Sequence, residues 1–110
     1  MKDEVNIVRL LKQRNLTAFS DVYNLYAPSF YQMIIKLTPD PAIAAHILEE
    51  IFVDFWKDIH AIAQKKDTVF IILLRLTYKH CMQILGLSKE KILQSLATSL
   101  PSSIPDTPIR

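Results

Sequence analysis

The chain has 110 residues, of which 50% are apolar and 22% charged, and 13 basic against 11 acidic side chains give a net charge of +2. This size predicts one globular domain, and the single glycine excludes glycine-rich phosphate loops and makes β-hairpins with primed turns unexpected. The scarcity of glycine therefore favours an all-α fold. One cysteine excludes an internal disulfide, and the longest apolar run, Val69–Leu74, is too short to span a membrane. We therefore expect an all-α cytoplasmic protein.

The first third of the chain predicts two helices. Apolar residues recur at helical spacing over residues 5–11, which indicates a short opening helix. Asn15 can then cap a second helix whose apolar spacing continues to Phe30. Pro28 falls within this run, and proline removes a backbone donor and clashes with the preceding turn. We therefore expect the second helix to kink or restart at Pro28.

A third helix is predicted most strongly. Asp40 can cap it, and Pro41 suits its first position. Its apolar residues recur along one stripe: Ile43, Ile47, Leu48, Ile51, Phe52, Phe55, Trp56 and Ile59. Charged residues fall on the opposite side: Glu50, Asp54, Lys57 and Asp58. This pattern is typical of an amphipathic helix with one buried face.

The next segments predict a fourth helix. Residues 61–66 have the composition of a fraying helix end, and Asp67 or Thr68 can cap a helix that runs to Gly86, a residue suited to a left-handed C-cap. The beginning of this helix, Val69–Leu74, is apolar almost all round. Such a segment is either buried on several sides or covered by a partner.

The C-terminal part predicts one more helix and a tail. Ser88 can cap a fifth helix, and three prolines in residues 101–110 predict a flexible end. We therefore expect a compact bundle of four to five helices over residues 1–86, an additional helix or the start of a linker over residues 87–100, and a proline-rich tail.

The sequence offers no catalytic or metal-binding pattern. The candidate ligands His46, His60, His80 and Cys81 lack the three- or four-residue spacing that places two ligands on one helix face. Aromatic residues from Phe19 to Tyr31 could stack on bases, but their helical spacing is more typical of a core. We expect no enzyme activity, no metal and no cofactor.

Two linked patterns carry a family resemblance. The second predicted helix reads Ala18-Phe19-x-x-Val22-Tyr23-x-x-Tyr26-Ala27-Pro28-x-x-Tyr31, and the third reads Ala44-x-x-x-Leu48-Glu49-Glu50-Ile51-Phe52-x-x-x-Trp56. With the intervening Asp40-Pro41, this segment resembles region two of the extracytoplasmic-function (ECF) sigma factors of bacterial RNA polymerase. The resemblance covers roughly residues 5–85 and implies a helical domain that acts in transcription initiation.

The resemblance also implies a partner for the third helix. In that family this helix docks on the clamp coiled-coil of the largest subunit of core RNA polymerase. Carried over by position, the polymerase-binding residues are Glu49, Glu50, Asp54 and Trp56. The acidic side chains would orient the complex through basic residues of the partner, and Trp56 is either a contact anchor or part of the core.

Promoter DNA is the second partner that the resemblance implies. The fourth helix of the family helps to open DNA at the minus-ten element, and the basic residues available here are Lys65, Lys66, Arg75 and Lys79. The family's usual aromatic, Asn, Asp and Arg positions hold Ile72, Lys79, Gln83 and Gly86 instead. Residues 87–110 are also too short for the second domain, region four, that follows in the family.

Two hypotheses therefore stay open. The first is a sigma-like domain that binds core RNA polymerase and promoter DNA. The second is a degenerate sigma-like interaction module that pairs with itself or with a regulator, such as an anti-sigma protein, through Val69–Leu74. The first requires available basic residues, and the second requires an exposed apolar segment on the fourth helix.

Overall fold

The computed structural model describes residues 4–63 and 67–99. In these ranges the protein is an all-α bundle, as the sequence predicts. Its helices, in chain order, are α1 (Glu4–Lys12), α2 (Leu16–Leu37), α3 (Pro41–Lys57), α4 (Ile59–Ile62), α5 (Val69–Leu85) and α6 (Lys89–Ser99). Within these ranges there is no strand. None of the helices in this part of the chain is long and apolar enough to cross a membrane.

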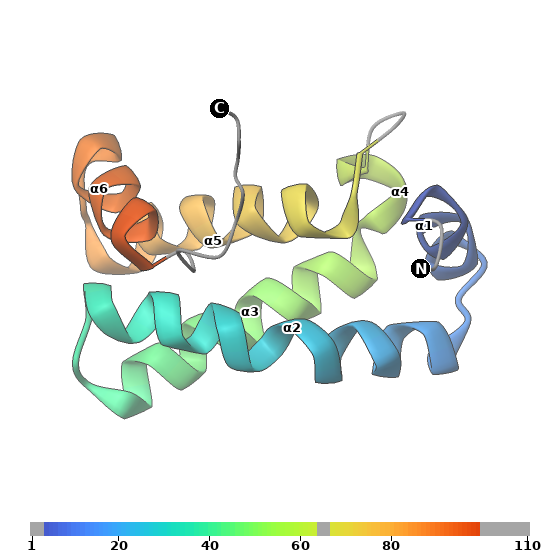
Figure 1. Ribbon diagram of the computed structural model, residues 1–110, viewed down its shortest axis with the longest axis horizontal. Helices are drawn as coiled ribbons and strands as arrows, with labels where there is room; N and C mark the ends of the chain where they lie inside the picture. Colours follow the sequence, from blue (N-terminus) through green and yellow to red (C-terminus); the bar gives the residue numbers. More distant parts are fainter. Residues whose placement is uncertain (1–3, 64–66, 100–110) are drawn as a thin grey trace.

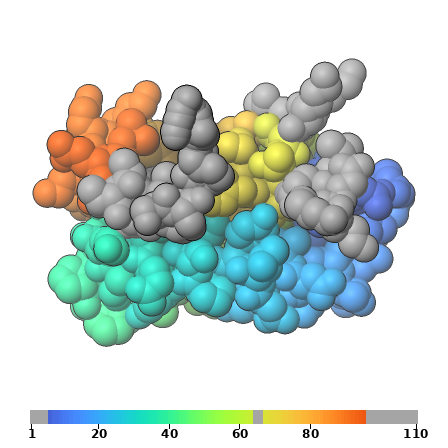
Figure 2. Space-filling model, viewed as in Figure 1, coloured from blue at the N-terminus to red at the C-terminus, as the bar shows by residue number. Residues whose placement is uncertain are grey.

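The core lies around α3. This helix packs against both α2 and α5; in Figure 1 α5 lies above α2, and α3 runs obliquely behind α2 toward α4. Ile47, Ile51 and Phe55 of α3 have no exposed surface. The C-terminal α6 packs on α2 and α5 and buries Ile92 completely, so it belongs to the same globule. Figure 2 shows α2 extending along the face below α5 and α6.

Helix ends form where the sequence predicts them. The side chains of Asn15 and Asp40 accept hydrogen bonds from backbone N–H groups in the first turns of α2 and α3, at 2.9 and 3.0 Å. Thr68 and Ser88 do the same for α5 and α6. Gly86 ends α5 with a φ of +66°, the left-handed conformation that glycine adopts without strain. These caps are local interactions, which is why the sequence reveals them.

The expected break at Pro28 does not occur. Pro28 lies inside α2, which continues without interruption for 22 residues. Both Pro28 and Asn24, whose carbonyl would have accepted the missing backbone hydrogen bond, are exposed, so water can bond to that carbonyl. The predicted restart was wrong, because it ignored the side of the helix on which the proline lies.

The segment after α3 also differs from expectation. Instead of a fraying end, the chain forms the short helix α4, whose first residue Ile59 is completely buried. The backbone N–H groups of Ala61 and Ile62 both donate to the carbonyl of Asp58, which starts this turn. Residues 64–66 and the predicted tail at 101–110 lie outside the described residues.

The apolar start of α5 is partly covered by the chain itself. Val69, Ile72 and Leu73 are at most 1% exposed. Phe70 and Leu74 are half-buried, and Ile71 is 40% exposed. Burial therefore explains three of the six residues of Val69–Leu74, and pairing through the other three stays a prediction.

Candidate protein-docking site

A surface groove of about 570 Å³ lies between α2 and α3. Its lining residues are Phe19 and Tyr23 from α2 and Ala45, Leu48, Glu49, Phe52, Val53, Trp56 and Lys57 from α3. We call this set the α2–α3 groove. A neighbouring hollow of about 390 Å³ shares Tyr23 and Leu48 with it and continues along α2 past Pro28. Together the two hollows follow the seam where these helices meet.

Packed aromatic rings form the floor of the α2–α3 groove. Phe19 lies 4.8 Å from Trp56 between ring centroids, and Tyr23 lies 4.8 Å from Phe52 in an edge-on arrangement. Phe52 is only 4% exposed, whereas Tyr23 is 41% exposed. Offset and edge-on contacts of this kind hold aromatic rings in defined positions. The groove is therefore a structured apolar surface that stays open to solvent at Tyr23.

The rim of the groove carries one charge of each sign. Glu49 and Lys57 are both exposed on α3 and lie eight positions apart. At 1.5 Å of rise per residue, this places them about 12 Å apart along the helix axis. Val53, halfway between them, is 41% exposed. An apolar strip with opposite charges at its two ends suits a partner helix that lies along it, with specificity from the charges and contact area from the strip.

The structure separates the four residues that the resemblance assigns to polymerase binding. Glu49 and Trp56 both line the α2–α3 groove. Glu50 and Asp54 are half-buried residues outside the groove lining, and Asp54 contacts α5. A rotation of about 100° per residue explains the division, because it brings positions 49 and 56 to one side of α3 and positions 50 and 54 to another.

Asp54 is paired inside the molecule. Its Oδ2 atom lies 2.6 Å from Nε2 of His80 on α5, and the two side chains are only 21% and 8% exposed. Lys79, also on α5, approaches the same oxygen at 3.7 Å through Nζ. A carboxylate with these two neighbours joins α3 to α5. The sequence placed Asp54 on the solvated side of α3, and the structure corrects this, because α5 covers that position.

Of the four basic residues assigned to DNA, the two that the structure describes, Arg75 and Lys79, face carboxylates. Both terminal nitrogens of Arg75 donate to Asp67, at 2.8 and 2.9 Å, and Lys79 faces Asp54. The hydrogen bonds from Arg75 to Asp67 raise the pKa of the guanidinium, with a smaller coulombic contribution opposed by desolvation. Each carboxylate offsets a positive charge that phosphate contacts need. Lys65 and Lys66 lie outside the described residues.

The buried thiol of Cys81 has no neighbouring group that activates it. Cys81 has no exposed surface, and burial raises the pKa of its thiol to about 11. Nowhere in residues 4–63 and 67–99 do three or more His, Cys, Asp or Glu side chains gather in a way that could hold a metal ion. Cys81 is therefore a neutral core residue near neutral pH.

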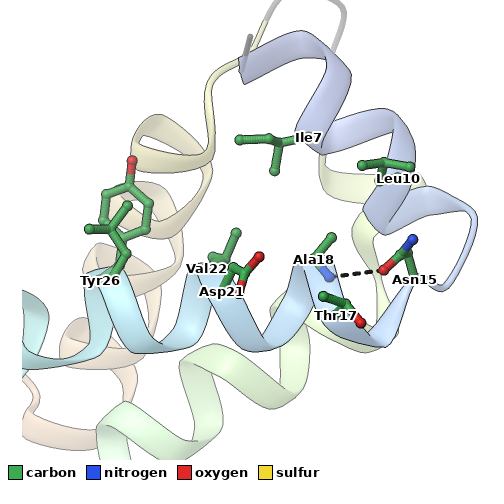
Figure 3. A pocket seen from close by; sticks show the side chains of 9 residues that line it. Ile7, Leu10, Asn15, Thr17, Ala18, Asp21, Val22 and Tyr26 are labelled. Carbon is green, nitrogen blue, oxygen red and sulfur yellow. Dashed lines mark hydrogen bonds between the residues drawn. The ribbon is translucent and has the colours of Figure 1, made fainter. Parts of the chain in front are cut away.

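A third hollow lies between α1 and α2 and has a volume of about 410 Å³. Figure 3 shows Ile7 and Leu10 of α1 on one side and Val22, Asp21 and Tyr26 of α2 on the other. Its lining is mostly aliphatic, and Asp21 is its one charged residue. Of the residues that the family resemblance assigns to a partner, those that the structure describes all lie outside this hollow.

Sequence analysis missed the residues that complete the site. Tyr23 has the same helical spacing as the aromatic residues assigned to the core, so its exposure was not predicted. Val53 lies outside the predicted apolar stripe of α3, and this position was the signal that it is exposed. His80 did carry a signal, because it follows Leu73, Leu76 and Thr77 on the buried stripe of α5, where an imidazole needs a hydrogen-bond partner.

Comparisons with known proteins identify no relative. No family model, no curated protein and no solved structure matches this chain.

Proposed function

We propose that this chain is a sigma-factor-like domain that binds core RNA polymerase through the α2–α3 groove, with the clamp coiled-coil of the largest subunit as its partner. The role is binding and not catalysis. The proposal starts from the resemblance of the α2 and α3 sequences to region two of the ECF sigma factors, which implies a helical domain, and the fold is all-α. The helix that docks in that family corresponds to α3, which provides seven of the nine groove residues.

The single observation that carries the proposal is the chemistry of the groove. Exposed Tyr23 and Val53 lie above a fixed aromatic floor, and Glu49 and Lys57 provide opposite charges on the rim. A helical partner with apolar residues between a basic and an acidic one fits this pattern. Aromatic residues in such positions are frequent energetic centres of protein interfaces, and the rim charges would fix the orientation of the partner.

The second hypothesis, a sigma-like module without specific DNA recognition, is supported by a separate observation. Arg75 and Lys79 face Asp67 and Asp54 within the same chain. DNA contacts through these cations would have to compete with carboxylates already in place. We therefore propose polymerase binding as the primary activity and expect promoter DNA to contribute little through these two residues. Val69, Ile72 and Leu73 are buried, so pairing through the start of α5 would rely on Phe70, Ile71 and Leu74 alone, and we propose it only as the second candidate.

The test is co-purification of the full chain with bacterial core RNA polymerase and with an isolated clamp coiled-coil fragment. Val53→Glu places a charge in the middle of the groove, and Ile84→Glu is its control, because Ile84 on α5 has a similar exposed fraction, 38% against 41%. Glu49→Lys reverses a rim charge, and Glu90→Lys makes the same change at an exposed site on α6.

The proposal expects the wild type and both controls to be retained. Val53→Glu should lower affinity by at least tenfold, which corresponds to about 1.4 kcal/mol, because it buries a charge in the interface. Glu49→Lys should weaken binding most at low salt, where rim charges act most strongly. Helicity measured by circular dichroism has to be equal in all variants. If the wild type is not retained, or the groove variants bind as well as their controls, the proposal is wrong.

A further inference from the structure

Arg14 has a backbone conformation that normally belongs to glycine. Its φ is +62°, and it is the one non-glycine residue with positive φ among the described residues. It ends α1 in a Schellman motif, in which the N–H of Asn15 donates to the carbonyl of Leu10 and that of Arg14 donates to the carbonyl of Leu11. Glycine is favoured at this position because a Cβ atom is strained there. Contacts made by the Arg14 side chain therefore have to offset this backbone strain.

The guanidinium of Arg14 reaches the far end of α3. Nη1 donates to the carbonyl of Trp56, and Nη2 donates to the carbonyl of Lys57 at 3.1 Å. Carbonyls in the last turn of a helix lack partners within that helix, and a cation is favourable there. The guanidinium carbon also lies 5.1 Å from the centre of the Trp56 ring, within the range of a cation–π contact.

A second contact fixes the same turn. Nε2 of His60, on α4, lies 2.9 Å from the carbonyl of Lys12. Since a carbonyl only accepts, this imidazole nitrogen donates. The turn that carries Arg14 is therefore held by α4 as well as by the end of α3. These contacts place the guanidinium against Trp56 from a part of the chain 42 residues away.

We propose that Arg14 is a positioning residue that holds the Trp56 indole in the α2–α3 groove. The indole contacts Phe19 in the groove and Arg14 at the end of α3. A planar guanidinium presents its donors in a fixed fork and can stack on an aromatic ring, whereas a lysine ammonium has neither the fork nor the planar face, so lysine is a poor substitute. The importance of Arg14 for polymerase binding rests on the proposed function. Its effect on Trp56 does not.

The experiment uses the fluorescence of Trp56, the only tryptophan in the chain. Emission maximum and acrylamide quenching are measured for the full-length wild type, Arg14→Gly and Arg14→Lys. Glycine accepts the φ of +62° without strain, so Arg14→Gly removes the guanidinium and leaves the turn intact. Arg9→Ala is the control, because it removes another exposed arginine whose guanidinium contacts Asn6 instead of α3.

We expect Arg14→Gly to shift the emission of Trp56 to longer wavelength and to increase its quenching. Arg14→Lys should restore neither property fully, and Arg9→Ala should match the wild type.

Affinity for core polymerase should fall on the order of tenfold in Arg14→Gly, as for loss of an ordered interface anchor. If the emission and quenching of Arg14→Gly equal those of the wild type, Arg14 does not position the Trp56 indole, whatever the affinity for polymerase. An altered emission with unchanged affinity, while Val53→Glu loses affinity, overturns its role in binding. A wild type that fails to bind overturns the proposed function, and the fluorescence still decides whether Arg14 positions the indole.

Discussion

Asp54 on α3 and His80 on α5 are joined through an Oδ2–Nε2 distance of 2.6 Å, at a point where both side chains are largely removed from water. This pair couples the helix that forms most of the groove to the helix that lies on its other side. The family resemblance assigns Asp54 to polymerase binding, but in the structure its carboxylate bonds to His80 of the same chain. Substitutions of Asp54 should therefore change the stability of the fold.

Asp54→Ala should lower the free energy of unfolding by about 1–3 kcal/mol, because it leaves the His80 imidazole buried without its hydrogen-bond partner. Urea denaturation followed by circular dichroism measures the change. Asp58→Ala is the matched control, because Asp58 is exposed at the end of the same helix and its side chain caps nothing. We expect the control to differ from the wild type by no more than about 0.5 kcal/mol. Equal losses in both variants would show that the Asp54–His80 pair contributes nothing specific.

Because of the buried thiol of Cys81, the free energy of unfolding should fall in alkaline solution. Burial raises the pKa of its thiol from 9.0 to about 11, so between these values the folded state holds a proton that the unfolded state has released. The stabilising contribution is therefore complete below pH 9 and declines as pH rises toward 11. Unfolding curves of the wild type and Cys81→Ala, measured from pH 8 to 10.5, should differ in slope, with the wild type falling more steeply. Parallel curves would contradict this.

Asp67→Asn tests whether intramolecular pairing keeps Arg75 from binding DNA. The substitution removes the carboxylate that accepts two hydrogen bonds from Arg75 at 2.8 and 2.9 Å. We expect stronger non-specific binding to duplex DNA than in the wild type, with a steeper dependence on salt. Fluorescence anisotropy at several salt concentrations measures both. Glu90→Gln, which removes one exposed acidic charge on α6, controls for net charge and should have a smaller effect. Identical behaviour of the two variants would mean that the Arg75–Asp67 pair does not restrict DNA binding.

Pro28→Ala should stabilise the protein. Pro28 lies inside the continuous helix α2 at an exposed position, so alanine restores a backbone hydrogen bond and a better helix former without filling space. The free energy of unfolding should rise by about 1–3 kcal/mol. Pro39→Ala is the control, because Pro39 lies between helices and its removal should only increase the entropy of the unfolded chain. Destabilisation by Pro28→Ala would indicate that the proline ring makes a packing contact that outweighs the hydrogen bond.

Local residue patterns are sufficient to predict the helical class and most helix ends. Asn15, Asp40 and Thr68 cap helices as expected, and Gly86 ends α5, because a cap depends only on residues within one turn of it. The apolar stripe of α3 likewise predicted its buried face, since helical spacing and burial are directly linked. Pro28 shows where local reasoning fails, because its effect depends on which side of α2 faces water.

Which side chains meet across the bundle depends on how distant helices pack. Asp54 and His80 are 26 residues apart, and Arg14 and Trp56 are 42 apart, so no local pattern could pair them. The same holds for the α2–α3 groove, whose open surface exists because α5 covers one side of α3 and leaves the side with Glu49 and Val53 free. Helix periodicity states which residues share a face. The packing of the other helices determines whether that face meets protein or water, because this depends on contacts between distant segments.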